Sequence, residues 1–360
     1  MKLGLFMMPL HPPTRPPFET YDEDLELIRR ADKLGFSEIW IGEHMSLPWE
    51  NIPNPELFIA RALAETDNIV FGTGVILLPL RNPVMVAHNI AMLDHLAKGR
   101  LIFGIGSGGT PNDAEMLGIK HDSTEFRERT SESIHIITRL WKEGPFDYEG
   151  KYYKLGKPQD RPELEMSFHM TPYQKPHPPI AVAGGSIRSR TLELAGEKGW
   201  IPLSASLVHR SHLQYNWQSV EQGAHSNGLK PSRHDWRVGK QVYVANTTEQ
   251  AKKEALSGAM ARDFTDYWAK LIGNSPSGLD TFKIDPETPD QDITPEYLLE
   301  NYWIVGDPDY CISEIEKLHK ESGGFGTLLI QTDDWGNHNS QFFNSMELLA
   351  KEVMPAIKDL

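Results

Sequence analysis

The sequence predicts an α/β fold, a TIM-type (β/α)8 barrel that forms a single domain with insertions. Two observations lead to this fold class. Short apolar runs alternate with amphipathic stretches throughout the 360 residues, and eight of these runs are candidate strands. Parallel strands need a crossover helix between them, which the alternation supplies. Eight strands over this length fit a closed barrel better than an open dinucleotide-binding sheet.

The expected strands are the short apolar runs at 2–8, 38–42, 69–78, 101–105, 180–183, 200–203, 236–245 and 327–331. The amphipathic stretches predict helices at 23–34, 54–65, 83–97, 125–142, 189–198, 208–223, 248–261, 308–320 and 344–357. In the first of these helices, Leu27, Ile28 and Ala31 recur at helical spacing, and Gly35 follows where a C-terminal cap belongs. Pro83 suits the first turn of the third helix.

Two segments interrupt the alternation of strands and helices. Residues 146–179 are rich in proline, tyrosine and charge, and residues 274–294 are acidic with few apolar side chains. Loops this long inside a compact domain are usually functional or disordered. We expect a lid within about 262–300. No repeat or shift in composition marks a second domain, so residues 1–360 are expected to form one.

The composition excludes several classes of protein. Apolar residues make up 39% of the chain and charged residues 24%, as in ordinary globular proteins. No apolar run approaches the ~20 residues of a membrane span, and the chain's start is too short and turn-rich for a signal peptide. The single cysteine, Cys311, excludes a disulfide framework and a multi-cysteine zinc site. We expect a cytoplasmic protein without a metal site.

The net charge of the chain limits which molecules it is expected to bind. The chain has 36 basic and 50 acidic side chains, which gives a net charge of −14. A negative surface repels phosphate backbones, so nucleic acid is not an expected partner. Backbone amides at a helix N-terminus can still bind one small anionic cofactor.

Candidate catalytic side chains are those that follow the strands, because barrel enzymes react at the carboxyl ends of their strands. Glu43 and His44 come directly after the second expected strand. A histidine at this place can reach the barrel mouth and act as a general base. The alternative is a hydrogen-bonded structural histidine, and position alone leaves the two interpretations about equal.

Glycines gather in or after three expected strands. Gly72 and Gly74 lie inside the third strand, which indicates either close approach of a flat ring or packing relief in a crowded barrel. The run 104–109 lets a flat ligand approach the backbone, but no helix is expected directly behind it, so it makes no dinucleotide fingerprint. The run 184–189 combines amides at a helix start with serine hydroxyls, which favours a phosphate site over a plain serine cap.

Five segments together resemble the bacterial luciferase-like flavin monooxygenase family. They lie in order over nearly the whole chain, at 39–44, 71–83, 93–106, 305–308 and 323–328. Segment 50–57 is similar to the two-component oxygenases of this family, which include diketocamphane and limonene monooxygenases. The resemblance implies an enzyme that oxygenates an apolar organic substrate with reduced FMN and dioxygen, through a C4a-peroxyflavin. Apolar residues near the expected mouth agree with such a substrate: Phe6, Met8, Met45 and Trp49.

The resemblance also implies partners. A separate flavin reductase would supply the reduced FMN, and the protein would be a homodimer. The helices at 54–65 and 83–97 are expected to form the dimer interface through their small residues, Ala60, Ala64, Ala87 and Ala91. Two other functions stay open, a deazaflavin-dependent oxidoreductase of the same superfamily and a non-catalytic flavin-binding protein.

Residue roles follow from the same resemblance. His44 matches the histidine that acts as the base, with Glu43 in support. Gly74 and Val75 match a bulge under the flavin ring, often with a cis peptide bond. Gly106 stands where luciferase has a cysteine near the flavin, so thiol-dependent behaviour is not expected.

The phosphate of FMN has its own expected site in the resemblance. Ser107 stands where the family has an arginine that can contact the phosphate, and Arg188 can replace that charge. The residues expected to bind the cofactor around its phosphate are Ser107, Gly184, Gly185, Ser186 and Ser189.

Overall fold

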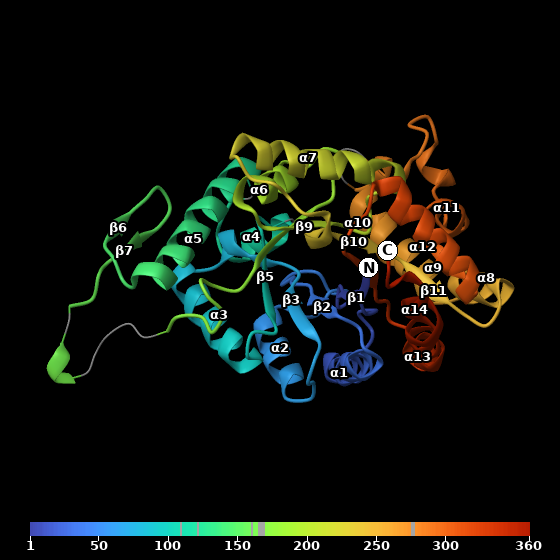
Figure 1. The fold of residues 1–360 in the computed structure, drawn as a ribbon, viewed down its shortest axis with the longest axis horizontal. Helices are drawn as coiled ribbons and strands as arrows, with labels where there is room; N and C mark the ends of the chain where they lie inside the picture. The colour runs from blue at the N-terminus through green and yellow to red at the C-terminus, as the bar shows by residue number, and fades with distance from the viewer. Residues whose placement is uncertain (109, 121, 160, 165–169, 275–277) are drawn as a thin grey trace.

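The structure, a computed structural model, describes residues 1–360 apart from 109, 121, 160, 165–169 and 275–277. A closed parallel barrel forms its centre (Figure 1), with the strands β1 (Lys2–Met7), β2 (Glu38–Ile41), β3 (Val70–Thr73), β5 (Leu101–Gly106), β8 (Ile180–Gly184), β9 (Ile201–Ser204), β10 (Arg237–Lys240) and β13 (Thr327–Gln331). The ring closes because β1 pairs with both β2 and β13, and β3 pairs with β5. The predicted eight-stranded barrel is confirmed.

Helices surround the barrel (Figure 1): α1 (Pro17–Leu34), α2 (Pro55–Leu63), α3 (Pro83–Ala97), α5 (Ser123–Glu143), α6 (Arg190–Lys198), α7 (Leu213–Ser226), α8 (Thr248–Ser257), α12 (Pro308–Ser322) and α13 (Asn339–Leu348). Gly35 ends α1 with a left-handed backbone, φ 83°, as the cap signal predicts. The side chain of Asn82 caps α3, and Pro83 occupies its first turn.

Apolar side chains fill both the barrel and the space between barrel and helices. Inside the barrel, the fully buried Trp40 packs with Ile102, Ala181, Leu203 and Leu329. A Cβ at Gly72 would lie 2.4 Å from the Trp40 ring. Gly72 therefore provides packing relief, which is one of the two interpretations left open by the sequence.

The run 236–245 is not one strand, contrary to the sequence expectation. β10 stays in the barrel, whereas β11 (Val242–Val244) pairs with β12 (Ile304–Gly306) in a separate two-stranded sheet. All three β11 residues are buried, so the run looks continuously apolar in sequence. The helix expected at 248–261 also divides, because Gly258 takes an extended conformation before α9 (Ala259–Asp263) begins.

A short helix corrects a second expectation. We expected no helix directly behind the run 104–109, but α4 (Pro111–Met116) begins there. Six residues make fewer than two turns, which is too short for an apolar periodicity to show in the sequence.

Two alanines of α3 that were expected at a dimer interface lie inside the protein. Ala87 and Ala91 are fully buried, and the main-chain oxygen of Ala87 accepts a hydrogen bond from the indole of Trp141 on α5. Small side chains let α3 pack closely against α5 and the barrel. The expectation that Ala87 and Ala91 contribute to a dimer interface is therefore wrong.

Both segments that interrupt the pattern carry structure. In the first, β6 (Tyr148–Glu149) and β7 (Lys154–Leu155) form a hairpin that projects from the barrel beside α5 (Figure 1). The second, 274–294, contains the 3-10 turns Asp280–Phe282 and Asp290–Asp292. It is flanked by a π-helix (Phe264–Trp268) and α10 (Ala269–Gly273) on one side and by α11 (Pro295–Asn301) on the other. A lid role for 262–300 stays a prediction. Over the described ranges, the helices are too short or too polar to cross a membrane.

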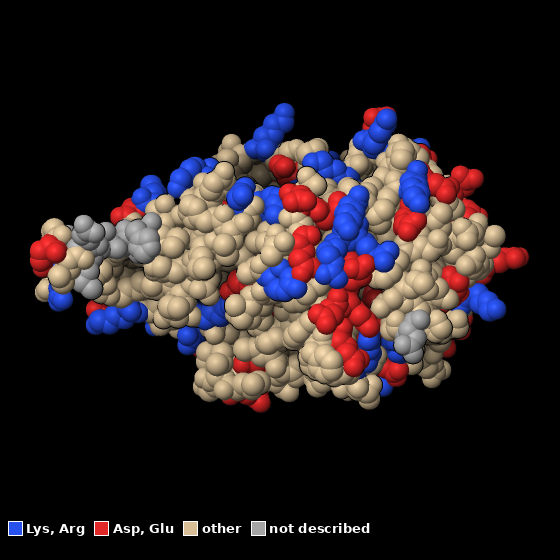
Figure 2. All heavy atoms as spheres, turned by 90° about the horizontal axis from the view of Figure 1, so that it is seen from below, with Lys and Arg blue, Asp and Glu red and all other residues tan. Residues whose placement is uncertain are grey.

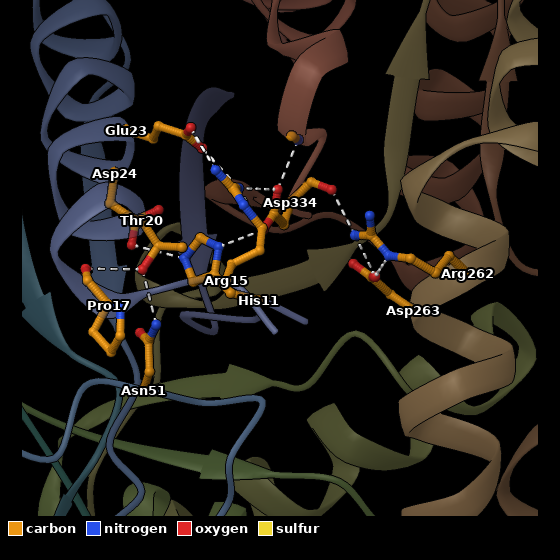
Figure 3. Close-up of polar contacts among 11 residues, drawn as sticks. His11, Arg15, Pro17, Thr20, Glu23, Asp24, Asn51, Arg262, Asp263 and Asp334 are labelled. Atoms are coloured by element: carbon orange, nitrogen blue, oxygen red, sulfur yellow. Dashed lines mark hydrogen bonds and ion pairs between the residues drawn. The ribbon is translucent and has the colours of Figure 1, made fainter. Parts of the chain in front are cut away.

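A buried polar network covers the seam between β1 and β13 (Figure 3). His11, which follows β1, lies 3.0 Å from the Asp24 carboxylate of α1 and 2.8 Å from that of Asp334 beyond β13. Arg15 donates hydrogen bonds to Asp334, 2.7 Å, and to Glu23, 2.6 Å. The network thus ties α1 to the end of the last strand.

The network sets the charges of its own members. Burial alone would lower the pKa of His11, but the carboxylates of Asp24 and Asp334 raise it to about 9. Burial would raise the pKa of Asp334, but hydrogen bonds from His11 and Arg15 lower it to about 2. His11 is therefore a buried imidazolium at neutral pH.

Replacing His11 tests this charge assignment. His11→Gln should lower the free energy of unfolding by about 3 kcal/mol near pH 6, because two buried carboxylates lose a charged partner. The folded-state pKa lies above the unfolded value of 6.5, so this contribution is complete below about pH 6.5 and disappears as the pH rises through about 9. Urea unfolding across this range measures it, with exposed His225→Gln as the control. A difference that persists unchanged well above pH 9 contradicts the assignment.

Candidate active site

A cleft of about 240 Å³ opens at the carboxyl ends of the strands. It is lined by Met8, Glu43, His44, Gly74, Val75, Leu77, Gly106, Ser107, Gly108, Ala183 and Thr191. The structure therefore brings together residues that the sequence singled out: Met8, Glu43, His44, Gly74, Val75, Gly106 and Ser107. A larger cavity of about 890 Å³ lies between α3, α5 and the β6–β7 hairpin. The smaller cleft is the candidate site, because strand ends carry the chemistry in this fold.

His44 lies between two buried carboxyl groups. Its Nδ1 is 3.3 Å from Oδ2 of Asp113, and its Nε2 is 3.5 Å from Oε2 of Glu50. Asp113 belongs to α4, and Glu50 to the loop after β2. Sequence reasoning missed both residues. The helix that carries Asp113 was not expected, and Glu50 stood in a segment noted only for its family resemblance.

Asp113 is held as an anion by its hydrogen bonds. One carboxylate oxygen accepts from the main-chain N–H of Met45, 3.2 Å, and of Ser46, 2.8 Å, and from the Ser46 hydroxyl, 2.5 Å. The other accepts from the Thr110 hydroxyl, 2.5 Å. Burial opposes ionisation, but these donors and His44 lower the pKa of Asp113 overall. The imidazole N–H at Nδ1 thus has a charged acceptor.

Glu43 and His44 are adjacent in sequence but have different hydrogen-bond partners. One oxygen accepts from the Arg81 guanidinium at 3.0 and 2.6 Å, and the other accepts from the N–H of Leu77 at 3.2 Å. Burial raises the pKa of Glu43 to about 7, although Arg81 favours the ionised form. Leu77 belongs to β4 (Ile76–Leu77), which pairs with β5. Glu43 therefore fixes the strand that follows the Gly74–Val75 step.

Bare backbone forms part of the cleft. The Gly74–Val75 peptide bond is cis. A Cβ at Gly106 would lie 2.5 Å from the Val75 side chain, and one at Gly74 would lie 3.1 Å from the Phe6 ring. The two glycines therefore let the side chains of Val75 and Phe6 pack close to the backbone, and they add no side chain of their own to the cleft.

β8 and α6 border the cleft through Ala183 and Thr191, whereas the loop that joins them, 185–189, is not part of the lining. Gly185, Ser186 and Arg188 are exposed on this loop. Its shape is fixed by the buried Asn216, whose Nδ2 donates to the main-chain oxygens at positions 186 and 187 at 2.9 and 2.8 Å. Sequence reasoning gave no signal for Asn216.

The serines of this loop have different tasks. Ser189 is buried, and its hydroxyl caps α6 by accepting from the N–H of Leu192, 3.3 Å. A Cβ at Gly184 would lie 2.4 Å from that hydroxyl, so Gly184 makes room for the cap. The Ser186 hydroxyl donates to the Arg188 main-chain oxygen, 3.1 Å. Ser186 is the serine that can turn toward a ligand.

Known proteins are similar to this chain over nearly its whole length. The family model described as luciferase-like monooxygenase matches residues 1–324. The chain is 32% identical to 3,6-diketocamphane 1,6-monooxygenase of Pseudomonas putida, covering 99% of this chain and 98% of the relative. It is 34% identical to 4-hydroxyprotoasukamycin monooxygenase of Streptomyces nodosus subsp. asukaensis, covering 99% and 92%.

A solved structure with the same architecture is similar as well. It is a type II Baeyer–Villiger monooxygenase, the oxygenating constituent of 3,6-diketocamphane monooxygenase from Pseudomonas putida, in complex with FMN. The TM-score is 0.91 at 33% identity, and the match covers 99% of this chain and 98% of the other.

Proposed function

The chain belongs to the luciferase-like monooxygenase family, and from this premise we propose that it is the oxygenating component of a two-component system that acts on an apolar organic molecule. It is an FMN-dependent monooxygenase, as the sequence led us to expect, and the FMN-bound neighbour favours FMN over a deazaflavin. The observation that carries the proposal is a glycine-lined cleft at the barrel mouth that also contains His44.

The residues of the cleft fit a flavin. Gly74, Gly106 and Gly108 present bare backbone in the lining, which a planar ring system can approach, and Met8, Val75 and Leu77 give the cleft apolar walls. When bound, reduced FMN supplies the electrons that activate dioxygen, and one oxygen atom is transferred to the substrate. Apolar walls exclude water, which would otherwise divert that chemistry.

His44 is proposed as the acid–base residue of the reaction. The ionised Asp113, 3.3 Å from Nδ1, favours the tautomer that carries its proton there, so Nε2 is the atom proposed to take up and release a proton. The substrate is proposed to be apolar because Met8, Val75 and Leu77 line the cleft and because Phe6, Met45 and Trp49 are half-buried apolar residues of the neighbouring strand and loop.

Replacing His44 tests this function. His44→Ala should fold normally and bind FMN, but form product about a hundredfold more slowly or worse, because positioned acid–base catalysis contributes about 10²–10⁴-fold. The assay combines NADH, FMN, a separate flavin reductase and a panel of cyclic ketones and terpenes, and it measures oxygenated product per reduced FMN. Exposed His225→Ala is the control. Unchanged product yield in His44→Ala refutes the role, and absence of any oxygenated product with the unaltered protein refutes the function.

The β8–α6 loop is proposed to bind the FMN phosphate. The loop carries exposed Gly185 and Ser186 ahead of the N-terminus of α6, and the chain's net charge of −14 makes such local donors necessary. Arg188 is exposed on the same loop and can add a positive charge.

Ser186→Ala distinguishes phosphate binding from other roles of this loop. A charge-assisted hydrogen bond contributes about 1.5–3 kcal/mol, so FMN should bind about tenfold more weakly, since ~1.4 kcal/mol is one decade. Riboflavin, which has no phosphate, should bind equally well to both proteins. Fluorescence titration measures both ligands. Equal weakening of FMN and riboflavin would show that the loop does not hold the phosphate.

We further propose a homodimer through the outer faces of α2 and α3. Leu57, Met85, Met92 and Leu96 are 72%, 59%, 56% and 52% exposed, which is unusual for large apolar side chains on neighbouring helices. Figure 2 shows that charged side chains gather in a band across the middle of the lower face, while the surface between this band and the hairpin is largely uncharged.

A charge on this face should separate the subunits. Met92→Asp places a carboxylate in the centre of the proposed interface, where it would be buried without a partner. We expect a dimer for the unaltered protein and a monomer for Met92→Asp, by light scattering at micromolar concentration. Leu229→Asp, at an exposed leucine on another face, should stay dimeric. A monomeric unaltered protein would rule the dimer out.

A further inference from the structure

Glu50 is a buried carboxyl group in the loop that follows β2. Its backbone forms a bridge with Leu10. The main chain on either side of it is fixed to the loop after β1, because the N–H of His11 donates to Trp49 at 2.7 Å and the N–H of Asn51 donates to Pro9 at 3.3 Å. Glu50 itself is 1% exposed. The two loops therefore hold this carboxyl in one place beneath the surface.

The two oxygens of Glu50 face different partners. Oε1 accepts a hydrogen bond from the Tyr267 hydroxyl. Oε2 has no hydrogen-bond partner in the described part of the chain, and it points at Nε2 of His44 from 3.5 Å. Burying a carboxyl in this way is costly unless a neighbour compensates, and the His44 ring is the group that faces this oxygen.

Tyr267 comes from a distant part of the chain. It lies in the π-helix Phe264–Trp268, within the segment 262–300, and π-helical turns occur frequently at functional sites. Its ring packs against Trp49, with 5.7 Å between centroids, and against Trp268, with 4.9 Å. Burial and the nearby Glu50 raise the pKa of Tyr267, so its hydroxyl stays a hydrogen-bond donor.

We propose that Glu50 and Tyr267 are positioning residues for His44, in which Glu50 holds the imidazole through Nε2 and Tyr267 holds Glu50. The inference rests on the proposed function only for the role of His44 in the reaction. It adds that the segment 262–300 reaches the catalytic histidine through a phenol and a carboxyl.

The charges around His44 explain the role of Glu50 and Tyr267. Asp113 faces Nδ1, Glu50 faces Nε2, Tyr267 lies behind Glu50, and the neighbouring Glu43 is engaged by Arg81. When His44 takes up its second proton at Nε2, an ionised Glu50 balances the new positive charge. Burial, with a smaller contribution from Asp113, raises the pKa of Glu50 overall, although His44 and the Tyr267 hydrogen bond oppose this rise. Tyr267 thus favours the ionised form of Glu50.

The test follows the protonation of His44 directly. Full-length protein without flavin is labelled with ¹⁵N-histidine, and the His44 signal among the 14 histidines is identified by its loss in His44→Gln. In Glu50→Gln the ratio of protonated to neutral His44 at a fixed pH should fall about tenfold or more, because a carboxylate within about 4–6 Å of a base has been removed. Tyr267→Phe should move the ratio in the same direction by a smaller factor, because Glu50 ionises less readily.

The double variant makes the test specific. If Tyr267 acts through Glu50, Glu50→Gln with Tyr267→Phe should match Glu50→Gln alone. Tyr302→Phe is the matched control: its buried hydroxyl donates to the main-chain oxygen of Thr281, away from His44, and its loss should leave the His44 signal unchanged. Circular dichroism and FMN binding establish that each variant is folded.

Two results would overturn the proposal. One is an unchanged protonation of His44 in Glu50→Gln, and the other is an effect of Tyr267→Phe that persists in full when Glu50 is already glutamine. Neither result depends on turnover, so the positioning role can fail while the enzyme still oxygenates, and it can hold even if the proposed reaction is wrong. In the reductase-coupled assay, Tyr267→Phe should shift the pH profile of product yield, which a purely structural residue would not do.

Discussion

Closure of the parallel barrel is the constraint on which the rest of the structure depends. β3 pairs with β5, and β1 with β13, so eight strands run in one direction and all their carboxyl ends meet at one mouth. His44, Gly74, Gly106 and the β8–α6 loop lie far apart in sequence, yet each follows or ends a strand and therefore arrives at the same place. The seam that joins the first and last strands is covered by His11, Arg15 and Asp334 (Figure 3). Arg262 extends this network, because its guanidinium donates to the main-chain oxygen of Asp334 at 2.5 Å and pairs with Asp263. The segment that carries Tyr267 is thus fastened to the same seam.

The sequence predicts the barrel well because its strands are short apolar runs, and because caps such as Gly35 and Pro83 act locally. It fails where a residue's role depends on partners that are distant in sequence. His11 and Asp334 are 323 positions apart, and Tyr267 and Glu50 are 217 apart, so no local pattern relates them. Asp113 lies on a helix of six residues, which is too short to show periodicity. Ala87 and Ala91 were misplaced for a related reason. A small apolar residue suits both a helix interface and a close internal contact, and only the packing of α3 against α5 decides between them.

The glycines show why some alternatives needed the structure. Gly72 and Gly106 look alike in sequence, since each lies in a strand among β-branched and aliphatic neighbours. A Cβ at Gly72 would meet the Trp40 ring inside the barrel, whereas a Cβ at Gly106 would meet Val75 in the cleft. Both glycines serve the close packing of a neighbouring side chain, but Gly106 does so in the wall of the cleft and Gly72 inside the barrel. Where each glycine lies along the barrel, and hence whether a ligand can reach it, is visible only in the structure.

The two carboxyls beside His44 differ because their surroundings differ. Asp113 receives N–H and hydroxyl donors from Ser46 and a hydroxyl from Thr110, and its pKa is lowered. Glu50 receives one phenol, and burial raises its pKa. Asp113 therefore keeps its charge and fixes one ring nitrogen, while the charge on Glu50 depends on the protonation of His44 and on the donor from Tyr267. A ring with one fixed and one adjustable neighbour has a defined tautomer and a defined atom for proton exchange.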